Sequence, residues 1–127
     1  MLLLMLGGAV GTYARYSLSR WFNAQPWGQT FPYGTLVVNV SGSFLLGVVY
    51  VLFMNRLPPD ARDWYLLFGT GFCGGYTTFS TFELETFQLV RNGSWGLALL
   101  NVGGSVAAGF VGVFLAVLLF DLLVPPG

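Results

Sequence analysis

The 127-residue chain contains no lysine and no histidine, a single cysteine, and charged side chains at only 8% of its positions. Soluble domains carry about 25% charged residues, and a globule this poor in charge could not cover its own surface. By contrast, 55% of the residues are hydrophobic and the mean hydropathy is +0.72. The composition therefore predicts an integral membrane protein, and the length fits a single domain, residues 1–127, of about four spans with roughly 20 residues each.

The residue types that are missing also exclude several kinds of site. Cys73 has no partner cysteine in the chain, so neither a disulfide framework nor a zinc cluster is expected. Without histidine, the usual pairing of a nucleophile with a base cannot be assembled, and we expect no enzyme. The net charge of zero argues against a nucleic-acid partner.

Four apolar stretches predict an all-α bundle of transmembrane helices. Their approximate ranges are 2–21, 33–54, 64–90 and 95–122, the third broken near 74–78. Arg15 lies inside the first stretch, where it either snorkels to the interface or lines a water-filled mouth that attracts anions.

The block "GGYTTFSTF", residues 74–82, is the most unusual part of the sequence. Its glycine pair falls near the middle of a span, so we expect a helix break there, and irregular backbone persists at that depth only when it is buried in protein or lines a polar cavity. The ends of two half-helices are also suited to holding small ions. Phe79 and Phe82 share one helix face, with a polar stripe containing Thr81 and Glu85 beside it. A small-residue helix contact with internally bonded hydroxyls is the simpler alternative.

Two asparagines lie within the second and fourth spans. Asn39 is expected either to form an interhelical hydrogen bond, worth about 0.6 to 2 kcal/mol, or to offer its amide to a permeating ion. On the fourth span, Asn101 and Ser105 share a face with small residues. That face is expected to pack against protein and not against lipid.

The arginines give almost no orientation signal. In a chain of four spans, Arg56 and Arg62 lie on one side of the membrane, while Arg20 and Arg91, with Arg15 if it is counted, lie on the other. Orientation follows the excess of basic residues, so this chain could insert both ways. An antiparallel homodimer, with its two-fold axis in the membrane plane, follows as a hypothesis.

Three segments together resemble the Fluc/CrcB fluoride-channel family, and the resemblance covers essentially the whole chain. They are "GGAVGTYARY" at 7–16, "GTLVVNVSGSFLLG" at 34–47 and "GGYTTFSTF" at 74–82. The resemblance implies an antiparallel, dual-topology homodimer in the cell inner (plasma) membrane, with two fluoride pores and a structural sodium ion at its centre, which exports fluoride passively.

The resemblance also implies roles for individual residues. Backbone carbonyls of Gly74 and Thr77 would hold the sodium ion, and Arg15 would lie near an aqueous vestibule. The implied pore residues are Phe79, Phe82, Asn39, Ser80, Thr81, Glu85, Asn101 and Ser105. Gly109 supplies no hydroxyl one turn beyond Ser105, so the polar path departs from the family pattern at that end.

Two other classes of membrane protein fit parts of the pattern. A small multidrug-type, proton-coupled transporter is also a four-span dimer, but it needs a deeply embedded carboxylate. Here the first two spans contain no acid, and the candidates are Glu83, Glu85 and Asp121. A purely structural membrane protein explains the small-residue faces but leaves the hydroxyl cluster unused.

Overall fold

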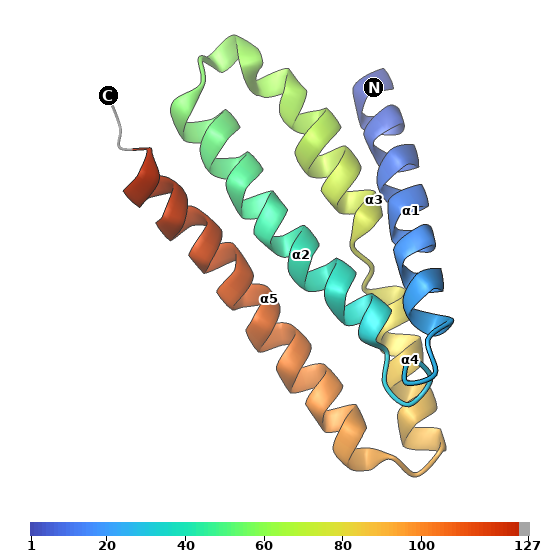
Figure 1. The fold of residues 1–127 in the computed structure, drawn as a ribbon. Coiled ribbons are helices and arrows are strands. Elements are labelled where there is room, and N and C mark those ends of the chain that lie inside the picture. The colour runs from blue at the N-terminus through green and yellow to red at the C-terminus, as the bar shows by residue number, and fades with distance from the viewer. Residues whose placement is uncertain (125–127) are drawn as a thin grey trace.

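The computed structural model describes residues 1–124, which fold into helices joined by short loops (Figure 1). The elements are α1 (Leu2–Asn23), α2 (Tyr33–Tyr50), the π-helical η1 (Val51–Arg56), the 3₁₀ turn η2 (Pro59–Asp63), the π-helical η3 (Leu66–Cys73), α3 (Gly74–Tyr76), α4 (Ser80–Arg91) and α5 (Trp95–Leu123). No strand occurs among these residues. The start of α1 and the end of α5 lie toward the same end of the molecule (Figure 1).

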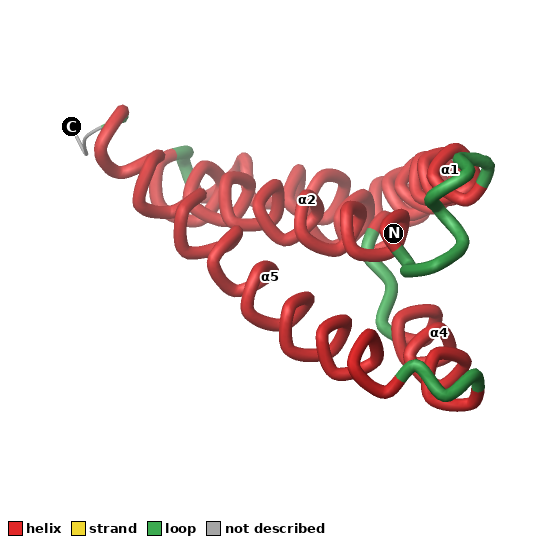
Figure 2. Tube along the Cα trace, turned by 60° about the horizontal axis from the view of Figure 1, so that its bottom comes forward, coloured by secondary structure: helices red, strands yellow, loops and turns green. Residues whose placement is uncertain are grey.

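Helix α2 lies at the centre of the packing. On one side it packs against α1 and against η3 with α3, which also contact one another. On the other side it packs along α5, which in turn contacts α4. Figure 2 shows α4 and α5 set to one side of α1 and α2, joined to them through the loop that follows α3. The cleft described below lies where α2, α5 and this loop meet.

Glycines bring α1 unusually close to η3 and α3. A Cβ atom added at Gly7 would lie 2.1 Å from Leu67 O, and one at Gly11 would lie 2.2 Å from Phe72 O. On the opposite side of the contact, a Cβ at Gly75 would lie 2.5 Å from Gly8 O. The backbones therefore touch directly, which is the type of contact that small residues permit between membrane helices.

Two helical segments of the described chain are long and apolar enough to cross a membrane. They are Tyr33–Arg56, with hydropathy 2.2, and Trp95–Leu123, with hydropathy 2.5. Much of the second is exposed in the single chain, including Leu99, Phe110 and Leu122. Such a surface is incompatible with water, and the chain is a membrane protein. That α1 and the broken η3–α3–α4 element also span the bilayer stays a prediction.

The third element is interrupted after the glycine pair and not at it. Gly74 and Gly75 are helical, and the backbone becomes extended at Thr77, whose ψ is 157°. Regular α-helix resumes at Ser80. Gly75 serves the contact with α1, whereas side chains of α1 and α2 bind the backbone released at the break, as described below.

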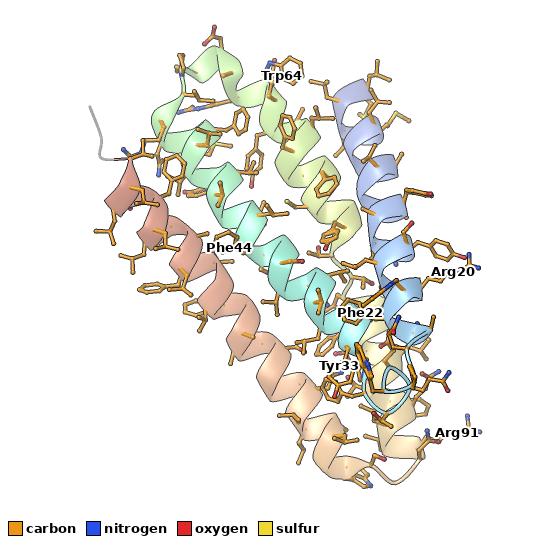
Figure 3. All side chains as sticks on the ribbon, viewed as in Figure 1. Arg20, Phe22, Tyr33, Phe44, Trp64 and Arg91 are labelled. Atoms are coloured by element: carbon orange, nitrogen blue, oxygen red, sulfur yellow. The ribbon has the colours of Figure 1, made fainter. Side chains whose placement is uncertain are left out.

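Aromatic residues gather toward the two ends of the molecule. The ring of Phe22 lies 5.9 Å from Trp27, whose ring lies 5.4 Å from Tyr33, each pair in an edge-to-face arrangement. Figure 3 places Trp64 toward the opposite end, while Arg20 and Arg91 project outward. Amphipathic aromatic rings of this kind favour the two membrane–water interfaces.

Candidate functional site

A cleft of about 310 Å³ lies beside the helix break, between α2 and α5. Six of the residues predicted from the sequence line it: Asn39, Gly74, Thr77, Phe79, Phe82 and Ser105. The remaining wall consists of Gly42, Ser43, Leu46, Cys73, Thr78 and Val106. The cleft therefore combines amide, hydroxyl and aromatic groups, and none of its lining residues carries a formal charge.

Asn39 binds the backbone of the break at two points. Its Nδ2 donates to Thr78 O over 2.9 Å, and its Oδ1 accepts from Thr78 N over 2.7 Å. This pairing replaces the hydrogen bonds that Thr78 would make inside a continuous helix. An Nδ2 group carries two hydrogens, so one donor of Asn39 remains for a ligand in the cleft. The structural and the ion-binding interpretations of Asn39 are thus compatible.

Arg15 reaches the same segment from α1. Its Nε donates to Gly75 O over 3.2 Å, and the side chain is half-buried. Gly75 lies near the carboxyl end of the η3–α3 helix, where unpaired carbonyl groups concentrate negative potential and favour a cation. The guanidinium of Arg15 therefore binds the last helical turn before the break.

Phe79 and Phe82 lie in different surroundings. Their ring centroids are 6.1 Å apart with planes inclined at 58°. Phe82 is 6% exposed on α4, whereas Phe79, which precedes that helix, is 75% exposed. The sequence spacing suggested one shared helix face, but the break ends just before α4, so only Phe82 has its position fixed by packing within the chain.

A chain of hydrogen bonds connects α4 to α5 near the cleft. Thr86 Oγ1 donates to Phe82 O, and Asn101 Nδ2 donates to Thr86 Oγ1 over 2.9 Å. Ser105 Oγ then donates to Asn101 Oδ1 over 3.3 Å. Asn101 is only 1% exposed. It ties the two helices together, while Ser105 presents its side of the network to the cleft.

Glu85 belongs to a different cavity. Its Oε1 accepts a hydrogen bond of 2.6 Å from Thr35 Oγ1, and Thr35 is buried. Glu85 lines a cavity of about 360 Å³ beneath the α1–α2 loop. The other polar side chains of this cavity are Asn23, Gln29, Thr30, Gln88 and Asn92. The structure therefore separates Glu85 from the break cleft and connects it to α2 through Thr35.

The two remaining sequence-predicted residues do not line the break cleft. Ser80 is exposed at the start of α4. Thr81 is half-buried, and its backbone N–H donates to Thr78 Oγ1 over 3.3 Å. Thr78, which directly precedes the N-cap residue Phe79, thereby takes up one N–H of the first turn of α4, as a capping side chain does. This capping role was not inferred from the sequence, although a threonine three residues before the bonded N–H is a typical capping signal.

No group of three or more His, Cys, Asp or Glu residues is found within residues 1–124 that could hold a metal ion. Backbone carbonyls are oxygen ligands of the kind that suits a hard cation. Gly74 and Thr77, the residues expected to supply them, both line the cleft.

Comparison with known proteins gives the family. The family model described as "CrcB-like protein, Camphor Resistance (CrcB)" matches residues 2–117. A protein of Leptospira interrogans named fluoride-specific ion channel FluC is 44% identical over 119 residues, which cover 91% of this chain and 92% of that protein.

Proteins with the same name in two other bacteria are also similar. The Roseiflexus sp. protein is 53% identical over 112 residues, covering 87% of each chain. The Solibacter usitatus protein is 47% identical over 118 residues, covering 93% of this chain and 95% of that protein. These relatives are named as channels and not as enzymes, in agreement with the expectation from the sequence. The family resemblance read from the sequence is confirmed, and the chain belongs to the CrcB-like protein family.

Proposed function

We propose that this protein is a fluoride-selective ion channel, a multi-pass protein of the cell inner (plasma) membrane through which fluoride leaves the cell passively. The observation that carries the proposal is identity of 53% over 112 residues to a protein named fluoride-specific ion channel FluC. The cleft at the helix break supplies the chemistry that such a pore needs.

A fluoride pore must replace the tightly held water of a small anion with hydrogen-bond donors. The second amide hydrogen of Asn39 and the hydroxyls of Ser43 and Thr78 are the donors in the cleft, while the hydroxyl of Ser105 donates to Asn101 Oδ1. The positive edges of the Phe79 and Phe82 rings add weak attraction without a fixed countercharge. Conduction needs binding that is favourable enough for entry and weak enough for exit, and uncharged donors meet both conditions.

The working form in this proposal is an antiparallel homodimer with two pores, embedded in the lipid bilayer. The exposure of Phe79, at 75%, supports a partner at the break, because a large aromatic ring beside polar groups is left uncovered in the single chain. The balanced distribution of arginines supports insertion in both orientations. Each chain contributes one break cleft, which gives two per dimer.

A structural sodium ion at the dimer centre is part of the proposal. The backbone fits it at two positions. In a continuous helix, Gly74 O would accept from Thr78 N and Thr77 O from Thr81 N. Those two N–H groups donate instead to Asn39 Oδ1 and to Thr78 Oγ1.

Carbonyl oxygens released in this way are suitable ligands for a hard cation. Gly74 and Thr77 of both chains would hold the ion. When bound, sodium supplies a positive charge that both carbonyl sets can share. It is a structural ion in this proposal and is not transported.

Growth of bacteria tests the proposed function in the cell. The gene is placed in a strain that lacks its own fluoride exporter, and growth is followed in rising fluoride concentration. The proposal expects fluoride tolerance relative to the same strain with an empty vector. Tolerance to a toxic organic cation with no gain in fluoride tolerance would instead favour the multidrug-type transporter.

A further inference from the structure

Side chains at the break divert two backbone N–H groups from their helical partners. Thr78 N donates to Asn39 Oδ1 over 2.7 Å, and Thr81 N donates to Thr78 Oγ1 over 3.3 Å. Regular i→i−4 bonding would direct the first to Gly74 O and the second to Thr77 O. Among the residues that the structure describes, neither of these carbonyls accepts a hydrogen bond outside the regular helices.

We propose that Asn39 and Thr78 are positioning residues for a cation: by taking these two N–H groups, they hold the carbonyls of Gly74 and Thr77 unpaired and available as ligands. The inference rests on the sodium site of the proposed function and assigns it side chains from outside the ligand set. Asn39 thus acts at the cation site in addition to offering a donor to the anion cleft.

Three other carbonyls near the break, those of Cys73, Gly75 and Thr78, accept hydrogen bonds. Cys73 O accepts from both the N–H and the hydroxyl of Thr77, and Gly75 O accepts from Arg15. Thr78 O accepts from Asn39 Nδ2. An unpaired carbonyl in the membrane interior is costly, so the chain would recover the helical bonds if their donors were free. The two diverted N–H groups therefore keep the break open.

The close packing of α2 against the break positions Asn39 to bind Thr78. Asn39 lies within α2, three residues before Gly42, and a Cβ atom at Gly42 would lie 2.4 Å from Thr77 Cγ2. This close approach brings α2 against the break. The amide of Asn39 can then reach Thr78 on both sides of its peptide group.

Sodium-dependent stability of the purified protein tests the inference with a matched pair of variants. Thermal unfolding in detergent is followed across a titration of sodium chloride, with N-methylglucamine chloride keeping the ionic strength constant. Bound sodium is also measured by atomic emission after desalting. Thr78→Val removes the acceptor for Thr81 N at almost constant shape, and Thr78→Ser retains it.

The half-saturating sodium concentration is expected to rise at least about tenfold in Thr78→Val and to stay within about twofold of wild type in Thr78→Ser. Asn39→Ala is expected to show the same rise. Ser43→Ala is the control, because Ser43 lines the same cleft but takes no N–H group from the break. High sodium should restore the melting temperature of Thr78→Val by mass action, which separates weaker binding from a general folding defect.

An unchanged sodium midpoint in both Thr78→Val and Asn39→Ala would overturn the inference. A wild-type protein that conducts fluoride but shows no sodium-dependent stability would also overturn it, leaving the channel function intact. Conversely, sodium-dependent stability that shifts as expected in a protein without fluoride conduction would uphold the positioning role and contradict the proposed function.

Discussion

At the scale of single residues, the two phenylalanines at the break differ in how they are held. Phe82 is fixed by packing on α4, and its carbonyl accepts from Thr86, which in turn accepts from Asn101. Phe79 is exposed in the single chain. Phe82 is therefore the ring whose contribution to the cleft can be tested with the least disturbance of assembly.

Replacement of Phe82 by isoleucine is expected to reduce fluoride efflux from liposomes about two- to tenfold, because it removes an aromatic edge worth about 0.5 to 1.5 kcal/mol in favourable contacts. Phe87→Ile on the exposed side of α4 is the matched control and should conduct like wild type. Elution of both variants at the wild-type position in size-exclusion chromatography checks the fold. Undiminished efflux through Phe82→Ile would remove this ring from the pore.

The sequence identifies the chemical groups of the site better than their pairings. Asn39, Phe82 and Ser105 were expected to face a polar cavity, and all three line the cleft. Thr35 lies four residues before Asn39 and shares its polar face by helical spacing, but its bond to Glu85 was not expected, because it depends on the placement of α4. Helical spacing shows which residues share a face. It does not show which distant partner meets that face.

At the scale of helices, the contact of α1 with η3 and α3 positions the break. Gly11 lies against Phe72 O and Tyr76 N, so α1 bears directly on the last turn before the extended segment. The same helix carries Arg15 to Gly75 O. Separation of α1 from this contact would therefore disturb the backbone of the last turn before the break and would remove the hydrogen bond from Arg15 to Gly75 O.

Gly11→Ala is expected to destabilise the protein by about 1 to 3 kcal/mol, because the new methyl group would be forced against backbone atoms. A Cβ there would lie 2.2 Å from Phe72 O, whereas one at Gly103 on α5 would meet nothing within 4 Å. Gly103→Ala is therefore the control. Thermal unfolding in detergent measures both, and equal melting temperatures for the two variants would show that the contact yields without penalty.

The helix break illustrates what local sequence cannot specify. The glycine pair drew attention to the correct stretch, but both glycines are helical, and the chain departs from the helix at Thr77. Glycine only weakens a helix, whereas the position of the break depends on where other helices offer partners to the released backbone. Those partners, Arg15 and Asn39, lie at least 39 residues away along the chain. The wide turns of η1 and η3 also had no signal in the sequence.

At the scale of the whole molecule, the single chain leaves polar and apolar surfaces uncovered. The break cleft is open, Phe79 is uncovered, and α5 exposes large apolar side chains along its length. Lipid can cover an apolar helix, but it cannot satisfy the polar groups beside the break. In the proposed antiparallel homodimer, a second copy would supply both a cover for the cleft and a second set of carbonyls.

Insertion in both orientations can be measured with one engineered thiol. In a Cys73→Ser background, Asp60→Cys places a cysteine on the exposed turn η2. Because the arginines give almost no orientation bias, about half of the molecules in intact cells should react with a membrane-impermeant maleimide, and the rest only after permeabilisation. Complete labelling from outside, or none, would contradict an antiparallel assembly.

The central claim, a fluoride-selective channel, is tested most directly by ion efflux from liposomes that contain the purified protein. The vesicles are loaded with potassium fluoride or potassium chloride, and a potassium ionophore starts the efflux. The account predicts rapid release of fluoride and negligible release of chloride. Retention of fluoride by vesicles that contain folded protein, or equal release of both anions, would contradict it.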